Sequence, residues 1–126
     1  MSKIDRVAVV TVAVKDQDEA LRWFTGKLGF VKRQDRQGPG IRWLTVAPAA
    51  EKDLALVLAS WFPEHVGKNA PLVVHTTDCR GTFRTLNDRG VEFTQPPSER
   101  PYGVEAVFKD LYGNAYALVE PPAATT

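Results

Sequence analysis

The sequence has a single cysteine, Cys79, so an internal disulfide and a zinc site built from several cysteines are excluded. Lysine and arginine number 16 against 15 aspartate and glutamate, and the formal net charge of +1 lacks the positive excess of a nucleic-acid or anionic-membrane binder. No apolar run reaches the roughly 18 residues of a membrane span, and the N-terminus lacks the apolar segment of a signal peptide. We therefore expect a cytoplasmic protein that binds neither nucleic acid nor membrane.

Several familiar functional motifs are also missing. The sequence has no Gly-x-Gly-x-x-Gly, Gly-x-Ser-x-Gly or Walker-type loop, so neither a nucleotide-binding protein nor a serine hydrolase is indicated. Hydrophobic residues make up 44% of the chain and charged residues 25%, which is typical of a globular protein with a packed core. A chain of 126 residues has room for one domain of ordinary size. We therefore expect residues 1–126 to form a single domain.

Two stretches of the sequence share one pattern. Residues 6–14 and 71–76 are rich in β-branched residues and predict buried strands. Each is followed by an aspartate that can cap a helix, Asp16 or Asp78, and then by apolar residues at helical spacing. Three short strands are predicted after each helix, at about 30–35, 41–47 and 53–59 and again at 91–95, 104–109 and 115–119. The sequence therefore predicts the order βαβββ twice.

The spacing between the two halves indicates a duplicated module. The capping residues Asp16 and Asp78 lie 62 residues apart, and the tripeptide Ala-Leu-Val recurs at 55–57 and 117–119 with the same offset. Repeated supersecondary units produce such an offset. The predicted boundaries are about 4–60 for the first module, 60–70 for a linker and 71–121 for the second module.

The motifs of this repeat resemble those of a known superfamily. They are Val-Lys-Asp at 14–16, Trp-Phe at 23–24, Leu-Gly-Phe at 28–30 and the Asp-x-x-Gly-Asn turn at 110–114. Together they resemble the vicinal oxygen chelate superfamily, which includes glyoxalase I, extradiol dioxygenases, fosfomycin-resistance enzymes and bleomycin-resistance proteins. The resemblance implies an α+β protein in which two βαβββ modules form a curled mixed sheet around a cavity, the glyoxalase/bleomycin resistance/dioxygenase fold.

Enzymes of that superfamily hold a divalent metal with side chains on the first and last strands of each module. The resemblance places the ligand positions of this sequence at Val9, Ala55, Pro71 and Ala117. None of these four side chains has a nitrogen, oxygen or sulfur atom that could bind a metal. Shifting the register by one residue brings no usual metal ligand to these positions. We therefore expect neither a metal nor another cofactor.

Apolar residues at the centre of the expected cavity favour binding of a flat or greasy organic molecule. Aromatic residues on a predicted strand (Trp43), in the linker (Trp61 and Phe62) and in the proline-rich loop (Tyr102) could stack on such a ligand. His75 shares the strand face of Pro71, although it lies some 13 Å along the strand. The predicted ligand-binding residues are Val9, Thr11, Trp43, Ala55, Trp61, Phe62, Val73, His75, Tyr102 and Ala117.

The leading hypothesis is a binding protein without a metal, which sequesters a small hydrophobic or aromatic compound such as an antibiotic. An alternative is a glyoxalase- or dioxygenase-like enzyme, acting as a lyase, isomerase or oxidoreductase with displaced metal ligands or no metal. His75 and Glu105 are then the candidate catalytic residues. A third hypothesis is an interaction module with a filled cavity. Uncovered sheet edges and apolar surface favour a homodimer in each case.

Overall fold

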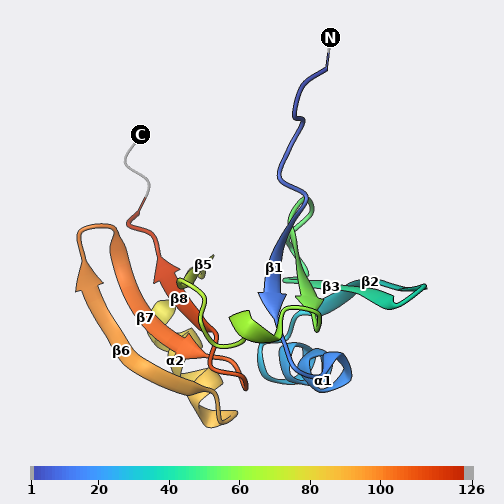
Figure 1. Cartoon of the computed structure of the whole chain (residues 1–126). Helices are drawn as coiled ribbons and strands as arrows, with labels where there is room; N and C mark the ends of the chain where they lie inside the picture. Colours follow the sequence, from blue (N-terminus) through green and yellow to red (C-terminus); the bar gives the residue numbers. More distant parts are fainter. Residues whose placement is uncertain (1, 124–126) are drawn as a thin grey trace. The chain divides into compact units, whose positions relative to one another are not determined.

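The computed structural model describes residues 2–123 and has an α+β fold (Figure 1). The chain divides between Glu64 and His65 into two compact units. The division falls within the predicted linker, which contains the short 3-10 helix η1 (Pro63–His65). Each unit has one helix and one mixed sheet of four strands in the order βαβββ. The predicted fold class and the duplicated order of elements are therefore confirmed.

The first unit contains β1 (Val9–Ala13), α1 (Gln17–Lys27), β2 (Val31–Gly38), β3 (Ile41–Ala47) and β4 (Ala55–Ala59). Its sheet has the order β1-β4-β3-β2, in which β1 is parallel to β4 and the other pairs are antiparallel. The helix begins where predicted, because the Asp16 carboxylate accepts a hydrogen bond from the Glu19 backbone N–H at 3.0 Å. On α1, Ala20 and Phe24 are fully buried, and the Phe24 ring lies 5.8 Å from that of Phe30. This apolar packing fixes the helix against one face of the sheet.

The second unit repeats this arrangement with β5 (Leu72–His75), α2 (Cys79–Asp88), β6 (Glu92–Arg100), β7 (Gly103–Lys109) and β8 (Ala115–Glu120). Its sheet has the order β5-β8-β7-β6, with β5 parallel to β8. Asp78 caps α2 by accepting a hydrogen bond from the Gly81 N–H at 2.9 Å. Beneath α2, the ring of Phe83 meets that of Phe93 edge to face at 4.6 Å. This contact identifies the sheet face that α2 covers.

The expected offset of 62 residues fails at the last strand of each unit. Thr11 pairs with Val57 in the first unit, whereas Val73, 62 residues after Thr11, pairs with Ala117. Ala117 therefore corresponds to Val57 and not to Ala55, and the repeated Ala-Leu-Val is displaced by two residues. The reason is the preceding connection, which has seven residues between β3 and β4 but five between β7 and β8. Two residues are one strand period, so the side chains keep their faces.

Strand β6 extends beyond its predicted end at residue 95. It continues through Pro96 and Pro97 to Arg100, with register shifts on both sides of Gln95. Proline is tolerated there because β6 is an edge strand of its sheet and contains bulges. Tyr102 consequently lies in the tight turn between β6 and β7, and not in a proline-rich loop as predicted. In the part of the chain that the structure describes, neither helix is long and apolar enough to cross a bilayer.

Candidate functional site

The face of each sheet that points away from its helix is called here the helix-free face. In the first unit, Arg42 on β3 forms an ion pair with Asp18 on α1, with 2.7 Å between Nη1 and Oδ1. Because side chains alternate along a strand, Trp43 and Thr45 point to the opposite, helix-free face. Thr45 pairs with Val57, so Val57 and the residues in phase with it on β4 share that face. The structure therefore places Trp43 on the helix-free face of the sheet, which the sequence alone could not decide.

Val9 and Ala55 are direct partners across β1 and β4, and both are half-buried on the helix-free face. Thr11 and Val57 form the next row of this face; Thr11 is exposed, whereas only 1% of Val57 is exposed. The two positions that the sequence offered for metal ligands in the first unit are therefore partners, but the register moves the counterpart of Ala117 from Ala55 to Val57, which is also a hydrocarbon side chain. The two partners meet through a valine and an alanine side chain, neither of which offers a donor atom.

Trp43 is the largest side chain on the helix-free face of the first unit. It is half-buried, and its indole Nε1 donates a hydrogen bond to Gln34 Oε1 at 3.0 Å. Gln34 on β2 pairs with Thr45 and is held by its own backbone N–H, which donates to Thr45 Oγ1 at 3.0 Å. The hydrogen bond at the ring edge therefore fixes the orientation of the Trp43 indole, and the flat surface of the ring is left as the part that a ligand could contact.

The helix-free face of the second unit follows from the Phe83–Phe93 contact. Phe93 pairs with Phe108, and the rings of Phe108 and Tyr116 stack at 5.0 Å, so these three rings lie under α2. The next residues along the strands point the other way. The helix-free residues paired in one row are Val73, Ala117, Val107 and Gln95.

Val73 and Ala117 are the apolar pair of the second unit. They are partners across β5 and β8; Val73 is 63% exposed and Ala117 is 5% exposed. Pro71, which the sequence offered as the counterpart of Val9, lies just before β5 and pairs with no residue of β8. The partner of Ala117 is therefore Val73 and not Pro71, and both of these side chains are apolar.

His75 and Glu105 lie in the next row, on either side of Val119. Two strand spacings put about 10 Å between the Cα atoms of His75 and Glu105. His75 is exposed at the end of β5, whereas Glu105 lies near the middle of β7 and is mostly covered. The two candidate catalytic residues share a face but lie outside direct hydrogen-bond reach in this arrangement of the strands.

Glu105 is surrounded by polar side chains from β6 and the following turn. Gln95 Nε2 donates to the Glu105 backbone oxygen at 3.2 Å and lies 3.5 Å from its Oε1, and Arg100 Nε lies 3.6 Å from the same Oε1. Tyr102 is half exposed, and its pKa is raised by partial desolvation and by its hydrogen bond to Glu105. Sequence reasoning missed Gln34, Gln95 and Arg100, because the register shifts in β2 and β6 that direct these side chains are not visible in a hydrophobic pattern.

Trp61 and Phe62 lie apart from these rows. They follow β4, both are half-buried, and their ring centroids are 6.1 Å apart. The strand registers place neither ring on a helix-free face. Their assignment to the ligand-binding site stays a prediction.

The superfamily's metal does not fit the residues at its expected positions. The pairs Val9–Ala55 and Val73–Ala117 contain only hydrocarbon side chains, and metal binding needs nitrogen, oxygen or sulfur ligands at about 2.0–2.6 Å. Among residues 2–123, no three His, Cys, Asp or Glu side chains lie close enough together to hold a metal ion.

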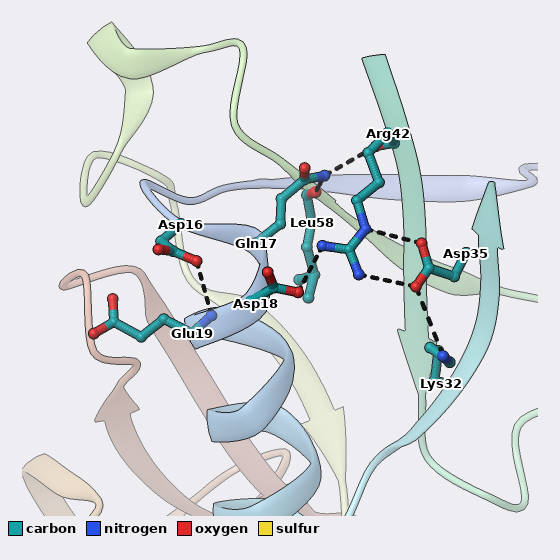
Figure 2. Close-up of polar contacts among 8 residues, drawn as sticks. All are labelled: Asp16, Gln17, Asp18, Glu19, Lys32, Asp35, Arg42 and Leu58. Atoms are coloured by element: carbon teal, nitrogen blue, oxygen red, sulfur yellow. Dashed lines mark hydrogen bonds and ion pairs between the residues drawn. The ribbon is translucent and has the colours of Figure 1, made fainter. Parts of the chain in front are cut away.

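A network of ion pairs lies on the opposite, helix-covered side of the first sheet. Figure 2 shows the Arg42 guanidinium between Asp18 of α1 and Asp35 of β2; its Nε and Nη2 donate to the two Asp35 oxygens at 2.8 and 2.9 Å. Gln17 Nε2 adds hydrogen bonds to the backbone oxygens of Arg42 and Leu58 at 2.9 and 2.7 Å. This network attaches the start of α1 to the sheet, so we assign it a structural role.

The network predicts a loss of stability in acid. The hydrogen bonds from Arg42 lower the pKa of Asp35 in the folded state. The carboxylate therefore contributes stability above its unfolded pKa, about 3.9, and this contribution is lost as the pH falls through the folded pKa. Asp35→Asn is expected to reduce the difference in unfolding midpoint between pH 7 and about pH 3, measured in urea. Asp5→Asn, the same change on the exposed N-terminal segment, should leave that difference unaltered. An unaltered difference in Asp35→Asn would contradict the prediction.

The chain belongs to the Glyoxalase/Bleomycin resistance protein/Dioxygenase superfamily, whose family model matches residues 3–118. The resemblance inferred from the motifs is thereby confirmed. The crystal structure of TnmS3, an antibiotic binding protein from Streptomyces sp. CB03234, is similar, with 34% identity and a TM-score of 0.87, covering 96% of this chain and 99% of that chain. The crystal structure of UcmS2 has 36% identity and a TM-score of 0.85, covering 94% and 99%. The uncharacterized protein YetH of Bacillus subtilis (strain 168) is 34% identical over 119 residues, covering 93% of this chain and 99% of YetH.

Proposed function

We propose that this protein binds and sequesters a flat hydrophobic or aromatic compound, such as an antibiotic, without a metal ion. The observation that carries the proposal is the pairing of Val9 with Ala55 and of Val73 with Ala117. These pairs occupy the helix-free faces where relatives with enzymatic activity are expected to hold their metal. Contact with hydrocarbon surface favours an apolar ligand by roughly 25 cal/mol for each Å² removed from water.

Two further observations support a binding role. Trp43 presents a ring on the helix-free face of the first unit, fixed by its hydrogen bond to Gln34. An oriented ring of this kind suits stacking on a planar ligand. In addition, the similar structure of TnmS3 is described as that of an antibiotic binding protein. The likeness extends over nearly the whole of both chains, which supports the same kind of ligand for this protein.

The catalytic alternative, a glyoxalase- or dioxygenase-like enzyme, has less support. It would require Glu105 and His75 to act together, or either of them to act alone. Val119 lies between His75 and Glu105 in the sheet, because it pairs with His75 on one side and with Glu105 on the other. General acid–base catalysis needs a side chain within about 3 Å of the proton that it moves, directly or through one water. A binding function makes no such demand.

Isothermal titration calorimetry tests the proposal. Purified protein is titrated with a panel of planar aromatic antibiotics before and after treatment with EDTA, and its metal content is measured in parallel. We expect saturable binding of at least one compound with the same affinity in both preparations, and recovery of that compound unchanged after incubation. Binding that depends on a stoichiometric metal, or turnover of the compound, would contradict the proposal and favour the enzyme.

We also propose that the protein acts as a homodimer in the cytoplasm. β1 and β5 each lie at an edge of their own sheet and are rich in apolar residues, with Val73 63% exposed. Edge strands with unpaired backbone groups are commonly covered by association. Sedimentation of the calorimetry samples at micromolar concentration should give twice the chain mass of 13.9 kDa.

A further inference from the structure

Polar side chains on the helix-free face of the second unit form one cluster around Glu105. Its members are Gln95 and Arg100 from β6, Tyr102 from the following turn and Glu105 from β7, and together they are called here the Glu105 cluster. Apolar side chains adjoin the cluster on β7 and β8, namely Val107, Ala117 and Val119, while the polar Ser98 and His75 lie in the row of Glu105. A carboxylate in such surroundings requires an explanation, since burial of an ionised group costs free energy.

The contacts of the carboxylate are long for its degree of burial. Only 16% of the Glu105 side chain is exposed, but Gln95 Nε2 and Arg100 Nε lie 3.5 and 3.6 Å from its Oε1. Charge-assisted hydrogen bonds to carboxylates usually have lengths of about 2.7–2.9 Å. Tyr102, which is 53% exposed, lies close enough to Glu105 for the carboxylate to contribute to raising its pKa. The carboxylate is therefore held in place while retaining capacity to accept a shorter hydrogen bond.

The backbone keeps this acceptor in a fixed position. Glu105 pairs with Ser98 on one side and Val119 on the other, so it lies within the sheet and not on a loop. The register shifts in β6 turn Gln95 toward Glu105, where its amide also binds the Glu105 backbone oxygen at 3.2 Å. A group that is fixed before binding loses little conformational entropy when a ligand arrives.

The corresponding position of the first unit has a different chemistry. Glu105 lies two residues before Val107, the partner of Ala117, just as Trp43 lies two residues before Thr45, the partner of Val57. A glutamine contacts each of them: Gln34 accepts from the Trp43 indole at 3.0 Å, and Gln95 approaches the Glu105 carboxylate. The two units therefore differ at this position: the first has an aromatic ring and the second has a hydrogen-bond acceptor.

The charge of the cluster selects the kind of group that it would accept. Arg100 already balances the negative charge of Glu105 at 3.6 Å. A ligand ammonium group near the carboxylate would also lie near this guanidinium and be repelled by it. A neutral hydroxyl can donate to the carboxylate without that repulsion. The ion pair therefore favours a neutral donor over a cation.

We infer that Glu105 accepts a hydrogen bond from a neutral hydroxyl group on the bound aromatic compound, and that the Glu105 cluster selects hydroxylated members of that class. The inference rests on the proposed function, because it assigns a polar contact to a ligand of the proposed class on the helix-free face of the second unit. It adds a criterion that the apolar pairs cannot supply, since hydrocarbon contacts barely distinguish a hydroxyl from a methoxy group.

A matched pair of probes tests the inference. Binding of 2-naphthol and of 2-methoxynaphthalene, which differ only in the donor hydrogen and its methyl replacement, is measured by calorimetry. The wild-type protein is expected to bind 2-naphthol about tenfold more tightly, the effect of one hydrogen bond to a charged acceptor. In Glu105→Gln, which keeps the size of the side chain but removes its charge, this preference should fall at least threefold.

The control is Glu99→Gln, the same chemical change on β6. Glu99 pairs with Val104 and therefore points to the other side of the sheet, where it is exposed. It should retain the tenfold preference, and the thermal midpoint of both variants should stay close to that of the wild type. Equal binding of the two probes by the wild type, or an unchanged preference in Glu105→Gln, would overturn the inference but leave the proposed function standing. Failure of both probes to bind would count against the proposed function and overturn this inference with it.

Discussion

Replacing Asp110 with alanine is expected to lower the free energy of unfolding of the second unit by about 3–4 kcal/mol. Asp110 is 5% exposed in the turn between β7 and β8, and its carboxylate accepts four hydrogen bonds. Oδ1 accepts from the backbone N–H groups of Tyr112 and Asn114 at 2.9 and 3.0 Å, and Oδ2 from Asn114 Nδ2 and the Tyr116 hydroxyl at 2.9 and 2.7 Å. Each donor that loses its acceptor in a buried place costs roughly 1 kcal/mol or more, which gives the expected total.

The loss of stability in Asp110→Ala should also affect the segment at the start of the second unit. Asn114, which Asp110 orients, accepts a hydrogen bond from the Gly67 N–H at 2.8 Å. Gly67 has a φ of 75°, and a Cβ there would lie 2.7 Å from the Tyr112 backbone oxygen, so this approach requires glycine. The turn therefore holds the segment that precedes β5 as well as the end of β7.

Urea unfolding followed by far-UV circular dichroism measures the effect. Tyr116→Phe provides a graded comparison, because it removes only one donor from Asp110 and should cost about 1–2 kcal/mol. Asp88→Ala, at the exposed end of α2, removes a carboxylate without such partners and should change stability by less than about 0.5 kcal/mol. A loss below about 1 kcal/mol in Asp110→Ala would show that the four hydrogen bonds contribute little net stability.

Replacing Trp43 with leucine is expected to weaken binding of the planar aromatic compound identified by calorimetry about 30-fold. If one face of the indole covers about 80 Å² of the ligand and its own ring, its loss removes about 2 kcal/mol at 25 cal/mol per Å². Leucine keeps an apolar side chain at the position, so the sheet should stay folded, and the freed amide of Gln34 can bind water because it lies on an exposed strand.

Fluorescence titration or calorimetry measures this affinity. Trp43→Phe keeps a flat ring and should recover most of the affinity, within about fivefold of the wild type. A thermal midpoint close to that of the wild type would confirm that each variant is folded. Equal affinities of Trp43→Leu and the wild type would remove Trp43 from the proposed ligand-binding site.

Local chemistry made much of the fold predictable. Asp16 and Asp78 each cap the helix that follows them. This could be predicted because an N-cap depends on a hydrogen bond between residues only three apart in the sequence. The sequence pattern predicts that β6 ends at residue 95, because two successive prolines, Pro96 and Pro97, usually end regular structure. Its continuation depends on its place at the sheet edge, which is a property of the whole sheet and not of a five-residue window.

The candidate site was predictable to a lesser degree. The apolar nature of Val9, Ala55 and Ala117 could be read from the family motifs, but the partner of Ala117 could not, because it depends on the different lengths of the connections before β4 and β8. The contact between Glu105 and Gln95 depends on two bulges. Neither feature leaves a periodic signal in the sequence.

The shorter connection before β8 bears on how the two halves could diverge. Thr45–Val57 and Val107–Ala117 are equivalent pairs in the two sheets, so the longer connection before β4 takes up the two extra residues and the strand pairing is kept. Because the difference is two residues, one period of a strand, an alignment of the halves that forbids gaps pairs the wrong residues of β4 and β8 while still placing inner residues opposite inner ones.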